Sequence, residues 1–396
     1  MSASQMGNSA TRVLDVWSHV APEFGGVGPA AAGLAMAVQQ NCGWQSRMLA
    51  VCDPAEDSVS DGIPGSVEKV AASGPRPAAD MRLRPALDAA IQASDVVHVH
   101  GLWLPHSVMT RLVAAKFQKP LVSSVHGMLE AWELKNKWLK KAIYAQLFER
   151  RSLARSHCLR ALSAQEAADY RRFGLKCPIA VVPNGISQLE RTDPGMFLRR
   201  FPHMADKSIV LFLSRMHFKK GILNLLQAWP AVLQSCPQSH LAIAGPDCQG
   251  TQRRAKEIIG RHNLHASVTF CGTLNGETKL AALSAARLFC LPSYSEGQSV
   301  AVLEALSIGL PVVITAACNV DGVSAAGAGV VTSNDPAKLA ASLIDCLSAS
   351  PSERQAMGNA GRALARTRFD WSVIGRRMHA VYSWMLGGPR PAWLVN

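Results

Sequence analysis

Two glutamates stand eight positions apart in the stretch PSYSEGQSVAVLEALSIGLPVV, residues 292–313. Glu296 lies in a turn after a strand-like run, and Glu304 lies on an apolar helical pattern from about Gln298 to Ile308. Eight helical residues span about 12 Å at 1.5 Å per residue. That length is comparable to the reach from a sugar, past a diphosphate, to a ribose. The two carboxylates are therefore candidates to accept hydrogen bonds from sugar hydroxyl groups.

The turn between the glutamates offers backbone donors. The N–H groups of Gly297, Gln298 and Ser299 should be free at the start of the helix, where the peptide dipoles favour a phosphate. Gly297 also lets the backbone approach a ligand closely. Spacing alone does not separate this interpretation from a simple capped helix with Glu304 at the surface.

A second candidate cluster is SRMHFKKG, in which Arg215 stands at a strand end and Lys220 precedes Gly221 at the start of a helix. Two cations around one such loop can bind a diphosphate and neutralise charge on a leaving group. The pattern is common on protein surfaces by itself. Its place shortly before the two-glutamate block makes it more specific.

A glycine-rich loop, EFGGVGPAA, follows the first predicted strand and contains Gly25, Gly26 and Gly28. It differs from the dinucleotide-binding pattern G-x-G-x-x-G, and Asp53 is the one acidic residue near the expected offset. We expect a loop that contacts phosphate or sugar.

His126 ends a buried strand-like run, and His98, His100 and His106 precede it. The H-x-H spacing puts two rings on one face of a strand but supplies no third metal ligand. A lone histidine at a strand end is usually structural, but its position favours a functional role here. The chain also has no D-x-D pair, so we expect neither a metal nor any other cofactor.

Composition limits the remaining classes of protein. The 396 residues carry a net charge of +13, which favours polyanionic partners. Residues 132–160 hold eight Lys or Arg and two Glu on a helical apolar pattern, so 134–155 is either an ordinary basic helix or one that binds an anionic membrane surface. Aromatic residues make up only 6%, which disfavours nucleic acid. Ten scattered cysteines, no secretion signal and no long apolar run predict a cytoplasmic protein.

Strand and helix signals alternate twice along the chain, which predicts an α/β protein with two doubly wound parallel sheets. We expect one domain over 1–190, a linker near 186–206 that contains Pro194 and Pro202, and a second domain over 206–371. A C-terminal helix, 372–390, is expected to pack back on the first domain. Ligands should bind where strands end, in a central cleft between the domains.

The order of these segments, with FGGVG, SVHGM, VVPNGI, SRMHFKKG, LAIAGPD and the two-glutamate block, resembles family 4 (group 1) retaining glycosyltransferases of the GT-B fold, in their bacterial exopolysaccharide and lipopolysaccharide branch. The match covers nearly the whole chain. One departure is Ser214, where the family usually has glycine before the arginine. The variable Gln298 and Ser299 do not identify the sugar.

The resemblance implies that the second domain binds a nucleotide-diphosphate sugar and the first binds a glycan or polyprenyl-pyrophosphate-linked acceptor. It implies that Glu296 contacts the donor sugar, that Glu304 contacts the ribose and that Arg215 and Lys220 bind the diphosphate. Gly25, Gly26 and His126 would lie on the acceptor side, with Gly26 and His126 facing the reacting sugar. We therefore expect a metal-independent, retaining transferase in the cytoplasm, with peripheral attachment to the inner face of the cell membrane as a further expectation.

Two alternatives remain open from the sequence. A nucleotide-sugar epimerase of the same fold would act on the donor alone, whereas a transferase needs an acceptor. A non-catalytic nucleotide-binding protein at the membrane surface would not need all of Glu296, Glu304, Arg215, Lys220 and His126.

Overall fold

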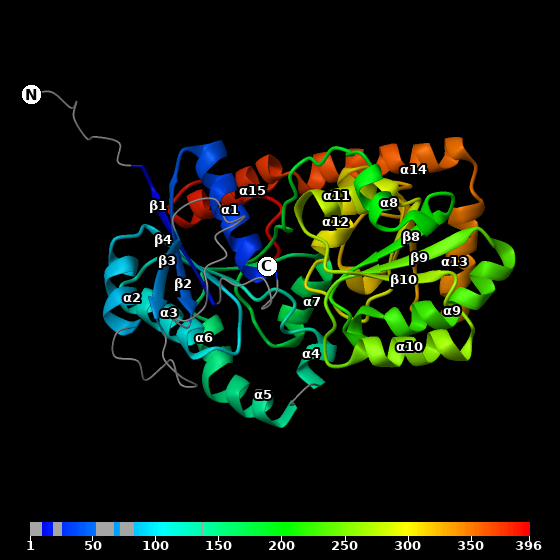
Figure 1. Ribbon diagram of the computed structural model, residues 1–396. Coiled ribbons are helices and arrows are strands. Elements are labelled where there is room, and N and C mark those ends of the chain that lie inside the picture. The colour runs from blue at the N-terminus through cyan, green and yellow to red at the C-terminus, as the bar shows by residue number, and fades with distance from the viewer. Residues whose placement is uncertain (1–9, 19–25, 53–66, 72–82, 136–137) are drawn as a thin grey trace, which may run out of the picture. The chain divides into compact units, whose positions relative to one another are not determined.

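The computed structural model describes residues 10–18, 26–52, 67–71, 83–135 and 138–396. The chain divides into two compact units, residues 1–185 with 371–396 and residues 186–370. Each unit is built on one parallel sheet, as the alternation of strand and helix signals predicts (Figure 1). Gly25 and Lys137 lie outside the described residues.

The first sheet has the strand order β3-β2-β1-β4-β5-β6-β7. Its strands are β1 (Arg12–Ser18), β2 (Gln45–Cys52), β3 (Val67–Ala71), β4 (Val96–His100), β5 (Leu121–Ser124), β6 (Cys158–Ala161) and β7 (Ile179–Val181). All described pairs are parallel. Strands β4 and β5 are buried throughout, as expected for a parallel sheet with helices on both faces. β3 is a strand that the sequence pattern did not predict.

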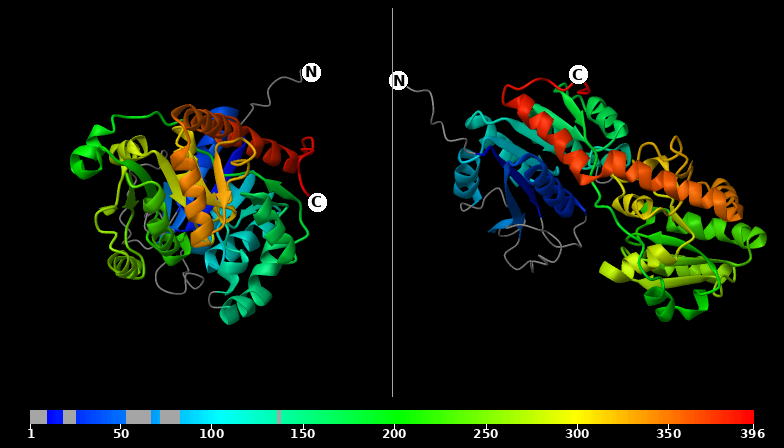
Figure 2. Two further views of the ribbon diagram at one scale, coloured as in Figure 1. Left: turned by 90° about the vertical axis from the view of Figure 1, so that its right-hand side faces the viewer. Right: turned by 90° about the horizontal axis from the view of Figure 1, so that it is seen from above.

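The helices of the first unit are α1 (Val27–Cys42), α2 (Leu83–Gln92), α3 (Pro105–Lys116), α4 (Ala131–Lys135), α5 (Trp138–Tyr144), α6 (Arg150–Leu153), α7 (Ala164–Arg172) and α15 (Trp371–Met385). A π-helical segment, Ala145–Glu149, joins α5 to α6. The C-terminal α15 lies along α1 (Figure 2). An added Cβ at Gly33 of α1 would lie 2.4 Å from the Trp371 ring, so the missing side chain permits this close approach.

The second sheet has the order β10-β9-β8-β11-β12-β13 and is also parallel. Its strands are β8 (Ser208–Leu213), β9 (Ser239–Ala244), β10 (Val268–Gly272), β11 (Leu288–Leu291), β12 (Val312–Thr315) and β13 (Gly329–Thr332). The helices are α8 (Gly195–Arg200), α9 (Ile222–Ser235), α10 (Thr251–Arg261), α11 (Gly276–Ala285), α12 (Val300–Ser307), α13 (Pro336–Ser348) and α14 (Pro351–Leu364).

In both sheets the strand order reverses direction beside the first strand. The change falls between β1 and β4 in the first sheet and between β8 and β11 in the second. Loops leaving the carboxyl ends of two such strands diverge, and doubly wound proteins bind ligands there. The loops after β1, β4, β8 and β11 are therefore the places to look for a site.

The segment 186–206 is not the linker that the sequence predicted. It contains α8 and the 3₁₀ turn Pro202–Met204, and it belongs to the second unit. Phe197 and Met204 are 2% and 0% exposed in that unit's core. Because the prolines in this segment start helical turns, they do not mark an unstructured linker.

No helix within the described residues is both long enough and apolar enough to span a membrane. All ten cysteines lie in described segments, and none of them forms a disulfide.

Candidate active site

The candidate site of the second unit is formed by the loops after β8 and β11. Lys220 ends a 3₁₀ turn, Phe218–Lys220, after β8, and Glu296 lies in the loop after β11. Lys220 Nζ is 2.6 Å from Glu296 Oε2, and both side chains are largely buried. The structure thus joins two residues whose separate roles were predicted from the sequence, at the point where the strand order reverses.

These two loops are packed against each other by their backbones. Gly221 has a φ of +72°, and a Cβ there would lie 2.0 Å from the Pro292 carbonyl oxygen. The Tyr294 N–H also donates to the Lys219 carbonyl oxygen, at 2.7 Å. A side chain at position 221 would therefore push the lysine loop away from the glutamate loop.

Additional side chains hold Glu296 in place. Ser293 Oγ donates to Glu296 Oε1 at 2.8 Å, and Asn319 Nδ2 donates to the Glu296 carbonyl oxygen at 2.5 Å. Thr315 Oγ1 in turn donates to the Ser293 carbonyl oxygen at 2.6 Å. Sequence analysis missed Ser293 and Asn319, although Ser293 lies only three residues before Glu296.

The helix after Glu296 begins later than predicted, at Val300 instead of Gln298. The Ser299 N–H donates to the Cys318 carbonyl oxygen at 3.0 Å, so the prediction that this amide is free was wrong. The reason is that the 3₁₀ turn Ala316–Cys318 packs against this loop. Gln298 and Ser299 are buried.

The other predicted residues of the second unit lie on the loop after β8 and on the helix that follows the Glu296 loop. Arg215 is exposed in the loop after β8. Glu304 lies on α12, where its Oε1 is 2.6 Å from Nζ of Lys279 on α11. Lys279 is a partner that sequence analysis missed, because nothing in the spacing of α11 and α12 indicates their register.

In the first unit, His126 follows β5 in a strained backbone conformation, with a φ of +53°. This left-handed region is unusual for a residue other than glycine and is typical of functional sites. The Gly127 N–H donates to Glu166 Oε1 at 2.5 Å, and the Leu162 N–H donates to Glu166 Oε2 at 2.6 Å. Burial raises the pKa of Glu166 to about 7.

The His126 ring is held by a chain of polar groups from neighbouring strands. His126 Nε2 is 3.1 Å from His100 Nδ1, and His100 Nε2 is 3.0 Å from Asp15 Oδ1. Burial raises the pKa of Asp15 to about 8, although the charge of Arg160 opposes this shift. Burial, together with Arg160, holds the pKa of both histidines well below the usual value. The histidines are therefore neutral at pH 7.

One potential group of metal ligands occurs among the described residues, formed by Asp15, His98 and His100. Asp15 on β1 is the third group that the H-x-H spacing did not supply, and it lies in register with His98 on β4. The His98 ring nitrogens are each 2.7 Å from a hydroxyl group, of Tyr382 and Ser124. Both ring nitrogens of His98 therefore have hydroxyl partners, whereas Asp15 Oδ2 is buried without a hydrogen-bond partner among the described residues.

Gly26, the remaining predicted residue among those described, belongs to the glycine-rich segment and is the N-cap of α1. His106 lies in the first turn of α3 and is buried.

The basic segment exposes several of its large apolar side chains, whereas Leu153 is buried. Trp138, Leu139, Ile143 and Leu147 are 65%, 57%, 55% and 56% exposed. This is the apolar surface over α5 and the π-helical segment. An ordinary basic helix would bury such a stripe, so the structure disfavours that interpretation.

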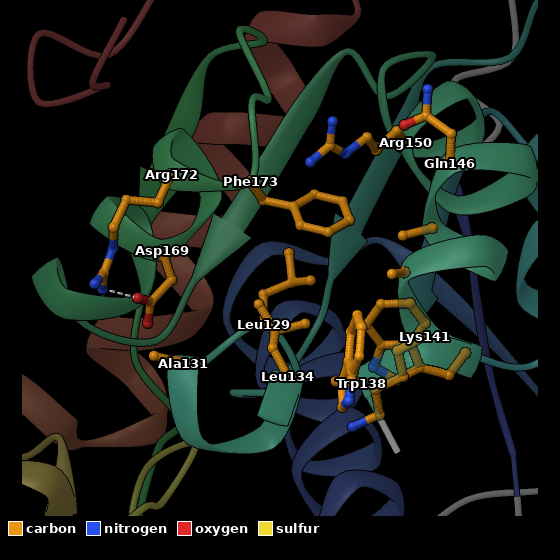
Figure 3. Close-up of a pocket in the computed structure, with 13 residues that line it drawn as sticks. Leu129, Ala131, Leu134, Trp138, Lys141, Gln146, Arg150, Asp169, Arg172 and Phe173 are labelled. Atoms are coloured by element: carbon orange, nitrogen blue, oxygen red, sulfur yellow. Dashed lines mark hydrogen bonds and ion pairs between the residues drawn. The ribbon is translucent and has the colours of Figure 1, made fainter. Parts of the chain in front are cut away.

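A pocket of about 500 Å³ lies beside this surface (Figure 3). Leu129, Leu134 and Phe173 supply apolar walls, and Lys141 and Arg150 supply cations. The Lys141 ammonium lies 5.6 Å from the Trp103 ring centroid. The lining is mainly apolar with a few charged groups, as in sites for amphipathic small molecules.

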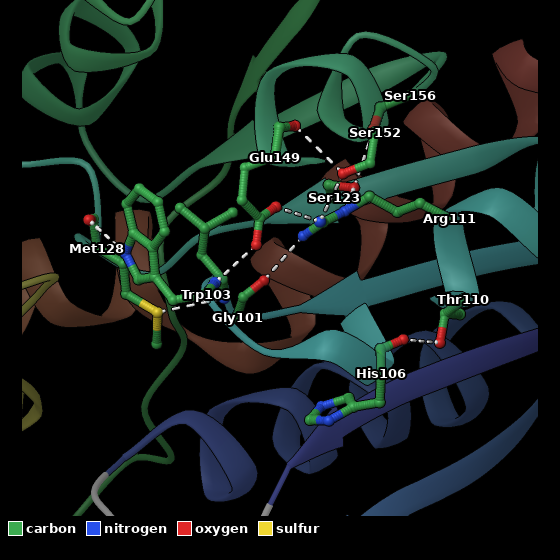
Figure 4. Close-up of polar contacts among 11 residues, drawn as sticks. Gly101, Trp103, His106, Thr110, Arg111, Ser123, Met128, Glu149, Ser152 and Ser156 are labelled. Atoms are coloured by element: carbon green, nitrogen blue, oxygen red, sulfur yellow. Dashed lines mark hydrogen bonds and ion pairs between the residues drawn. The ribbon is translucent and has the colours of Figure 1, made fainter. Parts of the chain in front are cut away.

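One wall of the pocket rests on a buried ion pair (Figure 4). Arg111 Nη1 donates to Glu149 Oε2 at 2.8 Å, and both side chains are fully buried. Glu149 Oε1 also accepts from the Trp103 N–H at 2.8 Å. Burial raises the pKa of Glu149, opposed by the charge of Arg111 and by these hydrogen bonds. The pair fixes Trp103 at the edge of the pocket.

The two units match two descriptions of protein families. Residues 198–364 match "Glycosyl transferases group 1", and residues 25–185 match "Glycosyl transferase 4-like domain". Together with the two parallel sheets, these matches define a glycosyltransferase of the GT-B fold. The chain is a glycosyltransferase whose second unit is of the group 1 type and whose first unit is of the 4-like type.

Several known proteins are similar to this chain along most of their length. The chain is 24% identical to the GDP-mannose:cellobiosyl-diphosphopolyprenol alpha-mannosyltransferase of Xanthomonas campestris, over 78% of this chain and 79% of the relative. It is 28% identical to glycogen synthase of Mycobacterium tuberculosis, over 73% and 68%. HepE of Anabaena, solved with UDP and glucose, superimposes with a TM-score of 0.74 at 19% identity, covering 94% of this chain and all of HepE. At this level of identity, the superposition with HepE shows only that the two proteins share a fold.

Proposed function

We propose that this glycosyltransferase moves a sugar from a nucleotide-diphosphate sugar to a glycan or polyprenyl-diphosphate-linked acceptor, with retention at the anomeric carbon. Its place would be the synthesis of cell-surface polysaccharide. The observation that carries the proposal is the Lys220–Glu296 ion pair at the strand-order reversal of the second sheet. The name of the Xanthomonas relative, which includes GDP-mannose, supports sugar transfer from an activated donor.

The donor would lie along the loops after β8 and β11. Lys220 and Arg215 would stabilise the negative charge that develops on the diphosphate as it leaves. Glu296, held by Ser293 and Lys220, would accept hydrogen bonds from the sugar hydroxyl groups. Glu304 would accept from the ribose, and the Gly297 and Gln298 amides would donate to phosphate oxygens.

In the transfer step, the bond between the anomeric carbon and the phosphate oxygen breaks. The acceptor oxygen bonds to the same face of that carbon, and its proton passes to the departing diphosphate. No protein nucleophile is required. His126, neutral and aligned by His100, would hydrogen-bond the reacting sugar, and Gly26 would leave room for it.

The charge stabilisation in this scheme comes from Arg215, Lys220 and backbone amides. We therefore infer that neither a metal nor another cofactor is required. Full turnover in EDTA is the expected result, and loss of turnover that Mg²⁺ restores would contradict this inference.

The first unit would bind the acceptor at a membrane. The apolar surface over α5 and the π-helical segment would enter the lipid interface, with Lys140 and Arg151 near anionic headgroups. The 500 Å³ pocket would take the first isoprene units of a polyprenyl chain, with its diphosphate near Lys141 and Arg150. The enzyme would then act at the inner face of the cell membrane.

The test is incubation with GDP-mannose, UDP-glucose and related donors, with and without a polyprenyl-diphosphate-linked sugar. Glycosylated lipid whose new linkage keeps the donor's anomeric configuration by NMR is the expected product. A donor that changes its sugar without any acceptor would instead identify a nucleotide-sugar epimerase. Nucleotide binding without turnover of any donor would favour the non-catalytic alternative.

A further inference from the structure

A separate pocket with a polar lining lies at the amino end of β11, whereas the Lys220–Glu296 pair lies at its carboxyl end. It has a volume of about 340 Å³ and contains four arginines. Arg287 immediately precedes β11, while Arg354 and Arg362 are two turns apart on α14. Arg191 comes from the segment before α8. We call these four residues the arginine pocket.

The arginines of the pocket donate to neutral acceptors. Arg191 and Arg362 both donate to the Ile308 carbonyl oxygen, at 3.3 and 2.8 Å. Arg287 donates to Ser208 Oγ and the Leu347 carbonyl oxygen, at 3.1 and 3.2 Å, and Arg354 donates to the Ala349 carbonyl oxygen.

Nearby acidic charge does not neutralise the pocket. Among the described residues, no carboxylate accepts a hydrogen bond from any of the four guanidinium groups. Glu353, the acidic neighbour of Arg354, instead accepts from the Ser350 N–H at 2.7 Å, which caps α14. The residues that line the pocket include four cations and no acid.

The four like charges repel each other. The pKa of Arg191 is lowered by burial and by the charge of Arg362. The pKa of Arg354 is lowered by burial and by the charge of Arg287, and the charge of Glu353 opposes this shift. Moreover, the Arg287 Nε is buried without a hydrogen-bond partner. An anion in the pocket would relieve the repulsion, because guanidinium groups bind phosphate oxygens with paired hydrogen bonds.

The location separates this pocket from the candidate donor site. Arg287 precedes the first residue of β11, whereas Glu296 follows the last. The four residues of β11 extend about 13 Å at 3.3 Å per residue, so one ligand phosphate cannot contact both ends. The volume of the arginine pocket is at the small end of the range for ligand pockets, about 300–1,000 Å³.

We propose that the arginine pocket binds a small soluble anion that carries phosphate groups, independently of the donor. Three of its arginines are half-buried around a concavity, and this arrangement favours a small ligand over the flat surface of a membrane.

The experiment measures pyrophosphate binding to the full chain by isothermal titration calorimetry. The variants are the double change Arg354→Gln with Arg362→Gln, the surface control Arg366→Gln, and Lys220→Ala. We expect the double change to weaken binding roughly tenfold or more, because two charged hydrogen bonds are lost. Arg366→Gln should bind like wild type, and Lys220→Ala, which lacks a donor-site cation, should retain the binding that depends on Arg354 and Arg362.

Either of two results with these variants would overturn the proposal. One is binding that is lost in Lys220→Ala and unchanged in the double variant, which would place pyrophosphate at the donor site. The other is binding to anionic phospholipid vesicles that depends on Arg354 and Arg362 without any pyrophosphate binding. If circular dichroism shows that the double variant is misfolded, the variant Arg354→Lys with Arg362→Lys replaces it. Lysine keeps the charge but not the paired donors, so pyrophosphate binding should still be weakened. Wild-type affinity in this lysine variant would also contradict the proposal.

Discussion

Lys220 and Glu296, which are 76 residues apart in sequence, form a 2.6 Å ion pair between the loops after β8 and β11. The pair places a cation and a carboxylate side by side at the strand-order reversal of the second sheet. A lysine in this position can contact a phosphate while it orients the carboxylate toward a sugar. The two residues should therefore behave as a unit in mutagenesis.

Replacing Lys220 by alanine should lower kcat for sugar transfer by roughly 10²–10³, the usual effect of losing one group that stabilises a leaving anion. Glu296→Gln should lower kcat as well, and the double variant should lose less than the product of the two effects. The matched control is Lys256→Ala on the exposed face of α10. Wild-type kcat in Lys220→Ala would refute the assigned role.

Changing Glu304 to glutamine should act mainly on donor affinity. Its carboxylate lies on α12 beside Lys279 and is proposed to accept from the ribose. Loss of one charged hydrogen bond should raise the donor KM roughly tenfold with little change in kcat. Glu257→Gln, an exposed change on α10, should leave both constants unaltered. A fall in kcat at constant KM would contradict a binding role.

The sequence predicted the sheets well because parallel strands covered on both sides are continuous apolar runs, as in SIVLFL of β8. It also predicted which loops carry Lys220, Glu296 and His126, since chemistry in doubly wound folds gathers at strand ends. Residues 186–206 were misjudged because their prolines indicate a linker, whereas burial of Phe197 and Met204 decides their structure.

Side-chain hydrogen-bond and ion-pair partners that depend on strand order could not be predicted from the sequence. Asp15 reaches His100 because β1 pairs with β4, a neighbour that lies more than 80 residues away along the chain. The pairs Lys220–Glu296 and Lys279–Glu304 likewise depend on how elements pack. Periodicity describes one element at a time, so it indicates a residue's face but not the side chain opposite it.

Asp15 makes stability depend on pH. Its pKa is about 8 in the folded protein against 3.8 when exposed, so between these values the folded chain holds a proton that the unfolded chain has released. Stability should therefore fall as pH rises, by up to about 1.4 kcal/mol per pH unit. The buried histidines act oppositely, but only below about pH 6.5, because their pKa values are lowered.

The histidines do not contribute between pH 6.5 and 8, so the free energy of unfolding should be measured in this range by urea denaturation. Wild type should lose stability across it, with Glu166 contributing at its lower end because its pKa is raised to about 7. Asp15→Asn should show a flatter dependence, and the surface change Asp95→Asn should behave like wild type. Parallel slopes for wild type and Asp15→Asn would show that Asp15 is already ionised.

Removing Glu149 should destabilise the first unit strongly. Glu149→Ala leaves Arg111 as a buried charge without its carboxylate partner, at a cost of about 3–5 kcal/mol. The double change Arg111→Met with Glu149→Gln should recover part of the loss, since glutamine keeps an acceptor for the Trp103 N–H. Arg84→Ala, which breaks an exposed pair with Asp88, should cost less than about 1 kcal/mol. Equal losses for the two single changes would contradict the argument.

The apolar surface over α5 and the π-helical segment should bind anionic vesicles. Leu139→Gln with Ile143→Gln should weaken binding by roughly tenfold or more, because burial of each leucine or isoleucine side chain contributes about 1.5–3 kcal/mol. Lys140→Gln with Arg151→Gln should instead reduce the salt dependence, since each cation near the surface contributes about 1 kcal/mol. Leu112→Gln, an exposed leucine on α3, is the control. Co-sedimentation that is equal for all variants would exclude this surface, whereas weakening confined to the apolar pair in zwitterionic vesicles would show that insertion does not need anionic lipid.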